Sequence, residues 1–363
     1  MPLKEPKWWY SGRSQNRAWM LAPLSRLYGR IAARRLRYAR PYTSLIPVIC
    51  IGNFTAGGTG KTPMTILISD RLRRMGERPA ILTRGYGGSM RGPHLVDLEK
   101  DLALQTGDEA LLLARAAPTI VSRDRAVGAR FIERQGDTPT VIVMDDGMQN
   151  PSLAKMLRIA VVDARRGIGN GHVIPAGPLR APLAAQLDIV DAIVINAGPA
   201  EPGRVPQSID ALHQFFRQKR FPGPILRGVI VPRTNAETFR GRPVLAFAGI
   251  GYPDRFFDTL RLSGIDVVEA IPFKDHHFFD AGDAERLLLR AEALQARLVT
   301  TEKDHVRLLS YADQRRELAA KSVPFRIAMT MPEEDIELLD ALIKYAIEPE
   351  DLSADRLLRH NQR

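Results

Sequence analysis

Residues 46–62, IPVICIGNFTAGGTGKT, decide the fold of this chain. The apolar run at 48–51 predicts a buried parallel strand, and residues 62–75, TPMTILISDRLRRM, place apolar side chains along one helical stripe. The glycines therefore lie at a strand-to-helix turn, where loop amides and the positive end of the helix can surround a polyphosphate. The predicted phosphate loop consists of Thr55, Ala56, Gly57, Gly58, Thr59, Gly60, Lys61 and Thr62.

Two residues at the end of this loop have the chemistry that a nucleoside triphosphate needs. Lys61 adds a point charge for the phosphates, and the hydroxyl of Thr62 can ligate Mg²⁺. The usual pattern, G-x-x-x-x-G-K-[ST], has glycine where this chain has Thr55. The strand before the loop, the helix after it and the lysine nevertheless favour a nucleotide site over an ordinary tight turn. They predict ATP and Mg²⁺ as cofactors.

An acidic pair follows a second apolar run. Residues 141–144 predict another buried strand, and Asp145 and Asp146 come directly after it. A carboxylate at the carboxyl end of a neighbouring parallel strand would face the phosphate loop, where Mg²⁺ requires oxygen ligands. Alone, such a pair is more often a turn or a helix cap. Beside a phosphate loop, we interpret Asp145 as a metal ligand and keep Asp146 as a weaker candidate.

Three further segments carry charged residues next to glycine or proline. Asp108 and Glu109 precede an apolar helical segment, where acidic residues ordinarily stabilise a helix start. Arg84 begins the loop RGYGG, and Arg180 ends the loop PAGPLR at 175–180. Either arginine could meet an anion, although arginines in glycine- and proline-rich turns are common. We keep both as weaker site candidates.

The composition indicates an α/β protein. With 363 residues, 45% of them hydrophobic, the chain can bury one large or two moderate cores, and strand-like runs alternate with helical patterns. We predict a P-loop NTPase-like, doubly wound, mostly parallel sheet with a second, smaller α/β domain. The single cysteine, Cys50, excludes a disulfide within one chain. Without a long apolar stretch or a secretory signal, the protein is expected on the cytoplasmic side.

The positive charge, +11 overall, is concentrated in residues 1–40. This arm holds ten Lys or Arg residues against one acidic residue, and it holds all three tryptophans. A helix over about 23–39 would place large apolar side chains on one side and most arginines on the other. Such a segment is typical of an anionic membrane surface. The alternative is a helix packed on the domain with a solvated basic face. Nucleic-acid binding is not expected, because no base-reading module follows.

Taken together, the motifs resemble those of tetraacyldisaccharide 4'-kinases, the lipid A 4'-kinases of Gram-negative bacteria. The shared segments, in order, are TAGGTGKTP, LTRGYGG, GDE, MDDGMQ, PAGPLR, FKDHHFF and TEKD. The resemblance extends from the basic arm to about residue 331. It implies ATP-dependent phosphorylation of the 4'-hydroxyl of tetraacyldisaccharide 1-phosphate in lipid A biosynthesis, by a peripheral protein at the cytoplasmic face of the inner membrane.

The resemblance also implies roles for individual residues. By matching position, Lys61 would contact the transferred phosphate, Asp108 would be the general base for the sugar hydroxyl, and His276 would be its partner across the active site. The residues implied for Mg²⁺ are Thr62, Glu109 and Asp145. Phosphoryl transfer mainly requires positioning and charge neutralisation, so this set is sufficient for the reaction.

Two positions depart from the family pattern, which more often reads Asp-Asp-Gly-Phe-Gln-His. Met148 replaces the phenylalanine, and Asn150 replaces the histidine. Methionine can fill the same apolar space, whereas asparagine cannot titrate and so cannot handle a proton as histidine does. Gln149, between them, is retained and is a weaker site candidate.

The expected organisation has four parts. They are a basic amphipathic membrane-associating arm at 1–40, a nucleotide-binding kinase domain at 41–225, a smaller α/β domain at 226–348 that closes the active-site cleft, and a polar tail at 349–363. His276 would lie in the second domain, so the site is expected at the cleft between the two domains. The expected partners are the lipid disaccharide 1-phosphate and an anionic membrane surface, and the oligomeric state is left open.

Two other classes fit part of the sequence. GGTGKT resembles the loop of ParA/MinD-like switch ATPases, which also use membrane-associated amphipathic helices, but those proteins carry a signature lysine where this chain has Ala56. The second alternative is a non-catalytic membrane-binding protein with a vestigial nucleotide site. The retained lysine, threonine and acidic elements argue against it.

Overall fold

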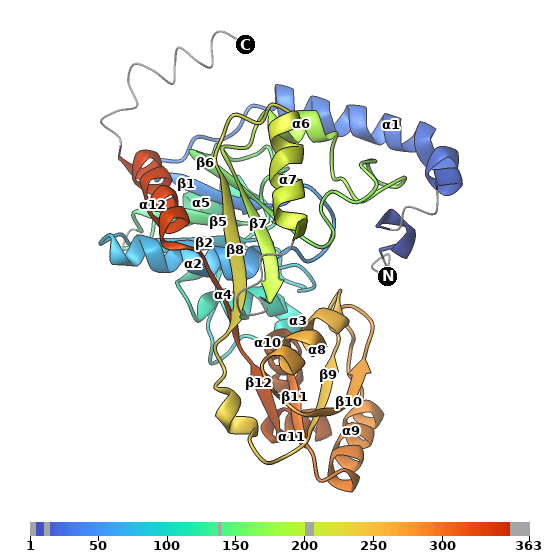
Figure 1. Ribbon diagram of the computed structural model, residues 1–363. Coiled ribbons are helices and arrows are strands. Elements are labelled where there is room, and N and C mark those ends of the chain that lie inside the picture. Colours follow the sequence, from blue (N-terminus) through green and yellow to red (C-terminus); the bar gives the residue numbers. More distant parts are fainter. Residues whose placement is uncertain (1–4, 11–14, 137–138, 200–206, 349–363) are drawn as a thin grey trace.

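The computed structural model describes residues 5–10, 15–136, 139–199 and 207–348. These residues form two α/β domains, and the N-terminal helix lies along the outer side of the larger one (Figure 1). The expected polar tail, 349–363, lies outside the described residues.

The larger domain is built on a nine-stranded sheet with the order β13-β8-β7-β6-β1-β5-β2-β4-β3. Neighbouring strands are parallel from β8 to β4, and only the edge strands β3 and β13 pair antiparallel within the described sheet. The strands are β1 (Val48–Gly52), β2 (Pro79–Thr83), β3 (His94–Leu95), β4 (Thr119–Val121), β5 (Val141–Asp145), β6 (Leu157–Asp163), β7 (Ala192–Pro199), β8 (Ile225–Pro232) and β13 (Ile327–Thr330).

The helices that accompany this sheet come from residues 15–218 and, after the smaller domain, from residues 333–347. They are α1 (Gln15–Tyr38), α2 (Lys61–Arg74), α3 (Ala103–Thr106), α4 (Asp108–Ala114), α5 (Arg125–Glu133), α6 (Leu183–Leu187), α7 (Gln207–Gln218) and α12 (Glu333–Ile347), preceded by a short 3-10 turn at Lys7–Trp9.

The smaller domain has its own four-stranded parallel sheet, with the order β10-β9-β11-β12. Its strands are β9 (Val244–Ala248), β10 (Val267–Pro272), β11 (Arg297–Thr301) and β12 (Ser322–Phe325), and its helices are α8 (Pro253–Leu262), α9 (Ala281–Ala293), α10 (Glu302–Leu309) and α11 (Gln314–Lys321), with a 3-10 turn at Ala236–Phe239.

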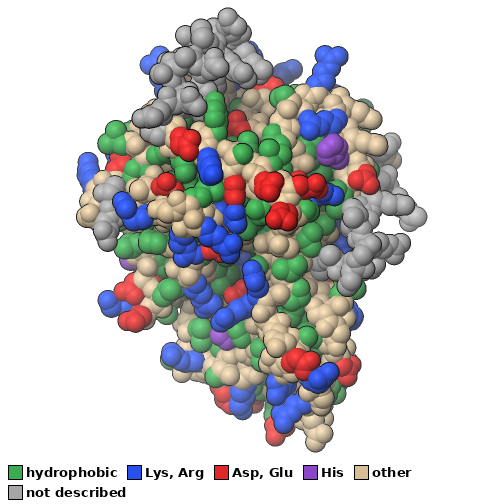
Figure 2. Space-filling model, turned by 60° about the vertical axis from the view of Figure 1, so that its left-hand side comes forward, with side chains coloured by type: hydrophobic (Ala, Val, Ile, Leu, Met, Phe, Trp, Pro, Cys, Tyr) green, Lys and Arg blue, Asp and Glu red, His purple; other side chains and the backbone are tan. Residues whose placement is uncertain are grey.

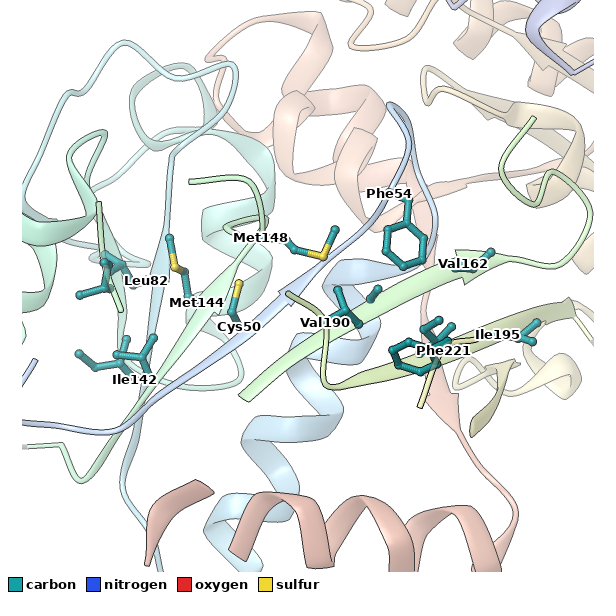
Figure 3. Close-up of a cluster of buried hydrophobic side chains, with 14 of the residues drawn as sticks. Cys50, Phe54, Leu82, Ile142, Met144, Met148, Val162, Val190, Ile195 and Phe221 are labelled. Carbon is teal, nitrogen blue, oxygen red and sulfur yellow. The ribbon is translucent and has the colours of Figure 1, made fainter. Parts of the chain in front are cut away.

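Burial on both faces of the large sheet explains the continuous apolar runs in the sequence. Val48 and Cys50 of β1 belong to one core cluster, whereas Ile49 and Ile51 belong to the cluster on the opposite face. Figure 3 shows Cys50 among the side chains of the first cluster. A parallel sheet covered by helices on both faces requires apolar side chains at successive positions. The predicted fold class is confirmed.

The border between the domains differs from the expected one at residue 225. β8, β13 and α12 belong to the larger domain, because β8 pairs with β7 and β13 pairs with β8. Arg71 of α2 pairs with Asp340 of α12, and Arg227 of β8 pairs with Asp335. The chain therefore leaves the large sheet after β8, forms the smaller domain and returns. Local sequence patterns do not reveal such a return, because the strands that pair are far apart in the sequence.

Helix α1 begins at Gln15, well before the expected start, and Pro23 lies inside it. Proline removes one helical hydrogen bond; Pro23 is exposed, so water can satisfy the freed carbonyl group. The face of α1 that packs on the domain carries small residues such as Ser25 and Gly29. The exposed large apolar side chains of the helix are Trp19, Met20, Leu24, Leu27, Tyr28, Ile31 and Tyr38.

The remaining tryptophans of the arm lie closer to the protein. Trp9 is buried and its indole donates a hydrogen bond of 3.3 Å to the Pro175 carbonyl, while Trp8 is half-buried. Positive charge is not confined to the arm, since Lys and Arg side chains also gather across the middle of the face shown in Figure 2. Among the described residues, no helix combines the length and hydropathy that crossing a bilayer requires.

Close packing at the end of β1 gives a stability prediction. A methyl group on Gly52 would lie 2.4 Å from Cβ of Met148, which is buried and cannot move away cheaply. We expect Gly52→Ala to lower the free energy of unfolding by about 1–3 kcal/mol through overpacking, measured by chemical denaturation. Gly136→Ala is the control, because no heavy atom of the described residues lies within 4 Å of its added methyl group. Equal stability of the two variants would contradict the packing argument.

Candidate active site

The phosphate loop joins β1 to α2, as the sequence predicted. Gly57 and Gly60 adopt φ angles of 94° and 100°, a region that favours glycine. Gly60 precedes α2, so Lys61 and Thr62 are the first two residues of the helix. The first amides of a helix lack partners within the helix and can bind an anion. The loop therefore has the backbone geometry of an anion-binding turn.

The loop at 175–180 supports the phosphate loop from the side. The Ala56 amide donates a hydrogen bond of 2.8 Å to the Pro178 carbonyl, and the Arg180 amide donates one of 2.9 Å to the Phe54 carbonyl. The Arg180 guanidinium donates another, of 3.1 Å, to the Thr55 carbonyl. The PAGPLR segment is thus more than a surface turn, because its backbone fixes the first half of the phosphate loop.

Asp146 is held by cations on two sides. Arg180 donates two hydrogen bonds to its carboxylate, of 2.8 and 3.2 Å, and Lys61 Nζ lies 3.8 Å from Oδ1. Burial by itself raises the pKa of Asp146, but Lys61 and Arg180 outweigh it and hold the pKa well below its usual range. Asp146 is therefore an anion that pairs with both Lys61 and Arg180 beside the phosphate loop.

Asp145 lies in a different environment at the end of β5. Its Oδ1 accepts a hydrogen bond of 2.9 Å from Thr65, and its Oδ2 is buried without a hydrogen-bond partner among the described residues. Burial, together with the carboxylates of Glu109 and Asp146, raises the pKa of Asp145 to about 7, although Lys61 lowers it. A buried, unpartnered carboxylate oxygen beside a phosphate loop fits a hard cation such as Mg²⁺.

Protein side chains alone do not complete a metal site here. In the part of the chain that the structure describes, no three His, Cys, Asp or Glu side chains converge closely enough to hold a metal ion. Mg²⁺ in nucleotide sites keeps several waters and binds phosphate oxygens, with only one or two carboxylates from the protein. The available donors, including the buried Thr62, match that pattern.

Helix α10 of the smaller domain neutralises the GDE triplet of the larger one. Arg307 Nε donates a hydrogen bond of 2.7 Å to Asp108 Oδ2, and Lys303 pairs with Glu109 at 2.5 Å. Burial raises the pKa of Asp108, but neighbouring His276 and the cations Arg307 and Lys303 outweigh it, and the pKa lies well below its usual range. Asp108 is therefore ionised at neutral pH although it is almost fully buried.

His276 faces Asp108 from the smaller domain. Its Nδ1 lies 3.7 Å from Asp108 Oδ2, and its ring is 5.1 Å from that of Tyr86, centroid to centroid. The backbone of His276 has a φ of 53°, and its amide donates a hydrogen bond of 3.0 Å to the Gly249 carbonyl. Asp108 raises the pKa of His276, against the effect of burial. His277, by contrast, pairs with Asp283 inside the smaller domain.

The RGYGG loop positions the GDE triplet through close backbone contact. A methyl group on Gly88 would lie 2.4 Å from the Gln105 carbonyl oxygen, and one on Gly107 would lie 2.5 Å from the Tyr86 carbonyl oxygen. The backbone of the RGYGG loop therefore packs directly against the chain before Asp108. Arg84 itself is exposed.

Met148, Gln149 and Asn150, which follow the acidic pair after Gly147, have structural contacts. Met148 is buried in the core, so it fills apolar space as expected. Gln149 donates hydrogen bonds of 2.7 Å to the Asn53 carbonyl and to Gln186. The Asn150 side chain accepts hydrogen bonds from the amide and the hydroxyl of Ser152, which stabilises a turn.

Sequence reasoning missed several cations of the site. Arg125, which begins α5, is buried close enough to the acidic pair to be affected by the charges of both carboxylates, and its Nε has no described hydrogen-bond partner. Lys303 and Arg307 complete the charge balance at the GDE triplet. Lys303 belongs to the TEKD segment, so that motif was an available signal. Arg125 and Arg307 stand in ordinary helical patterns.

These features define a class of protein. A phosphate loop that faces carboxylates at the carboxyl edge of a parallel sheet belongs to the P-loop nucleoside triphosphate-dependent enzymes. Within that class, a sequence model of the family described as Tetraacyldisaccharide-1-P 4'-kinase matches residues 17–344. The chain belongs to the tetraacyldisaccharide 4'-kinase family and is a kinase of lipid A biosynthesis. The ParA/MinD-like alternative is not favoured.

Individual relatives agree with this assignment. The chain is 48% identical over 309 residues to the tetraacyldisaccharide 4'-kinase of Rhodopseudomonas palustris, covering 84% of this chain and 86% of that protein. It is 43% identical over 343 residues to the enzyme of Azorhizobium caulinodans, with 94% and 96% covered. A crystal structure of LpxK from Aquifex aeolicus in complex with ATP has a TM-score of 0.68 at 24% identity, over 91% of this chain and 99% of that chain, and shows that the fold is shared.

The pairing of Asp108 with His276 predicts a measurable change in titration. In Asp108→Asn the largest cause of the raised pKa of His276 is removed, while burial and Arg307 still lower it. We therefore expect the pKa of His276 to fall below its wild-type value, measured from the imidazole signals in NMR.

Asp275→Asn is the matched control, since Asp275 lies 3.9 Å from the other ring nitrogen and is more exposed. A smaller decrease is expected there. An unchanged pKa in Asp108→Asn would show that the two side chains are not coupled.

Proposed function

We propose that Asp108 accepts the proton of the 4'-hydroxyl of tetraacyldisaccharide 1-phosphate while Lys61 neutralises the transferred phosphate of ATP. The observation that carries this proposal is the approach of Asp108 to His276 across the border of the two domains, 3.7 Å apart. Asp108 comes directly after Gly107, whose backbone packs against the Tyr86 carbonyl. The next residue, Glu109, is near enough to raise the pKa of Asp145.

In the proposed reaction the hydroxyl oxygen bonds to the γ-phosphorus and the bond from that phosphorus to the bridging oxygen breaks, so that ADP leaves. The hydroxyl proton passes to Asp108 Oδ2, the oxygen that faces His276 and Arg307. Oδ1 accepts a hydrogen bond of 2.7 Å from the Glu109 amide and Oδ2 accepts one of 2.7 Å from Arg307 Nε, so the proton goes to the second lone pair of Oδ2. The low pKa of Asp108 is compatible with this role, because phosphoryl transfer depends mainly on positioning and charge neutralisation.

We propose Thr62, Glu109 and Asp145 as the residues that hold Mg²⁺. The support is the buried Oδ2 of Asp145 without a described partner and the carboxylate of Glu109 near it. If bound there, Mg²⁺ would supply positive charge that neutralises the phosphate oxygens of ATP. Lys303 pairs with Oε1 of Glu109 in this structure, which leaves the other carboxylate oxygen, Oε2, as the candidate metal ligand.

These roles predict large kinetic effects. Lys61→Ala and Asp108→Ala should each lower phosphorylation of the lipid disaccharide by about 10²–10⁴-fold, because each removes an interaction with the transition state. Product is measured by mass as one added phosphate, with ATP and Mg²⁺ supplied.

Lys100→Ala serves as the control because Lys100 is exposed and pairs only with Asp97 in the described contacts. Folding is checked by circular dichroism. Wild-type turnover in either site variant would remove that residue from the proposal, and ATP hydrolysis without lipid phosphorylation would instead support a switch ATPase.

We also propose that the arm binds the anionic cytoplasmic face of the inner membrane through α1. The support is the distribution of side chains on this helix. Small residues pack against the domain, and the large apolar residues are exposed beside Arg26, Arg30 and Arg34. A helix of this kind can bury its apolar side chains at the boundary between headgroups and acyl chains while its arginines meet lipid phosphates.

Vesicle binding tests this role of α1. Leu27→Ser with Ile31→Ser should weaken binding to anionic vesicles by at least about tenfold, because burial of each large aliphatic side chain contributes about 1.5–3 kcal/mol. Arg30→Glu with Arg34→Glu should weaken binding mainly at low salt.

Leu289→Ser, at an equally exposed apolar position on α9, is the control. It should bind as the wild type does. If the α1 variants and the α9 variant sediment equally with vesicles, α1 is not the membrane contact.

A further inference from the structure

An arginine of the smaller domain reaches the carboxyl ends of two strands of the large sheet. Arg255 lies in the first turn of α8, and its Nη1 forms an ion pair with Oδ2 of Asp163 at the end of β6. Its Nη2 donates a hydrogen bond of 3.3 Å to Oδ1 of Asn196 in β7. Asp163 and Asn196 are register partners on neighbouring parallel strands, so one guanidinium group spans both.

Asn196 extends this contact to the phosphate loop. Its Nδ2 donates a hydrogen bond of 2.8 Å to the carbonyl of Thr59. The same nitrogen would lie only 2.4 Å from a methyl group on Gly60, so the amide packs directly against the turn that precedes Lys61. A continuous series of polar contacts therefore leads from α8 of the smaller domain to the backbone of the phosphate loop.

The guanidinium group of Arg255 lies in a buried, polar environment. Asp163 and Asn196 are almost completely buried, and the Arg255 side chain is mostly buried. Burial lowers the pKa of Arg255, and the charge of Asp163 opposes that effect. Gly198 has a φ of 82°, and a methyl group there would lie 2.8 Å from Arg255 Nη2. Removal of the arginine would leave a buried carboxylate without its cation.

We propose that Arg255 is a positioning residue that couples the placement of the smaller domain to the geometry of the phosphate loop. With α8 against the ends of β6 and β7, Arg255 orients the Asn196 amide, and that amide holds the Thr59 carbonyl so that the loop is ready for ATP. When α8 moves away, the loop loses this support. The proposal rests on the assignment of residues 55–62 as the ATP-binding loop.

A direct contact between Arg255 and the phosphates of ATP is the competing explanation. The two described contacts of its guanidinium group, to Asp163 and Asn196, favour the indirect role. The explanations differ in a double-mutant cycle. If Arg255 acts through Asn196, the effect of its removal depends on the presence of Asn196, whereas a direct phosphate contact does not require the amide.

The test uses the full chain with Arg255→Ala, Asn196→Ala and the double variant. The Kd of a non-hydrolysable ATP analogue with Mg²⁺, the KM values for ATP and for the lipid disaccharide, and Tm are measured. We expect each single variant to raise the Kd and the KM for ATP by about tenfold with little change in the KM for lipid, and the double variant to be no worse than Asn196→Ala.

Two further variants keep the test decisive. Arg261→Ala, on the same helix, is the matched control, because Arg261 is exposed and lies near only Asp258 among the described contacts; it should bind ATP as the wild type does. Arg255→Lys retains a cation for Asp163 but cannot span both partners. It should keep Tm near the wild-type value and still weaken ATP binding, so the proposal remains testable if Arg255→Ala unfolds.

The outcomes distinguish the positioning role of Arg255 from the assignment of residues 55–62 as the ATP-binding loop. Wild-type Kd and KM for ATP in Arg255→Lys and Arg255→Ala would overturn the positioning role, and additive effects in the double variant would replace it with a direct contact. Failure of the wild-type chain to bind the ATP analogue would instead remove the assignment of the phosphate loop.

Discussion

The parallel pairing of β1 with β5 is the constraint on which the active site depends. Ile51 stands opposite Asp145 in the register, so the two strands end at the same edge of the sheet. The phosphate loop continues from one strand and the buried carboxylate terminates the other. β6 and β7 end at the same edge and contribute Asp163 and Asn196. In a doubly wound sheet, strand direction brings together the groups that lie at the carboxyl ends of the strands.

The smaller domain supplies charge to an edge that is rich in carboxylates. Lys303 and Arg307 of α10 pair with Glu109 and Asp108, and Arg255 of α8 pairs with Asp163. Buried carboxylates are costly unless cations or hydrogen bonds accompany them. Because these cations come from another domain, the ionisation and the geometry of the site depend on how the two domains sit together. That dependence is suited to a kinase that must admit a large lipid substrate and then exclude water.

The N-terminal helix shows the reverse of ordinary surface packing. Its small residues face the protein, as the hydrogen bond of 2.7 Å from Ser25 Oγ to the Val173 carbonyl illustrates, while its largest apolar side chains are exposed. A helix that served only to cover the domain would bury those large side chains, since their burial contributes most to stability. The arrangement instead leaves them available to another apolar phase, and Trp9 anchors the preceding turn to the domain.

The sequence by itself determined the local parts of this protein. The strand at 48–51, the glycine-rich turn, the following helix and the acidic end of β5 were predicted because each depends on side-chain periodicity and backbone requirements of neighbouring residues. The matched motifs also indicated Asp108 and His276, which the fold brings together from distant positions.

Only the tertiary structure decided to which domain β8, β13 and α12 belong and that α1 continues through Pro23. It also decided which cations accompany each carboxylate. Arg255 and Arg307 look like ordinary charged residues of amphipathic helices, yet both are largely buried against the other domain. Their partners lie far away in the chain, so no local sequence pattern predicts these buried ion pairs. Strand order and charge pairing depend on contacts between residues that are far apart in the sequence, so they are settled only when the whole chain packs.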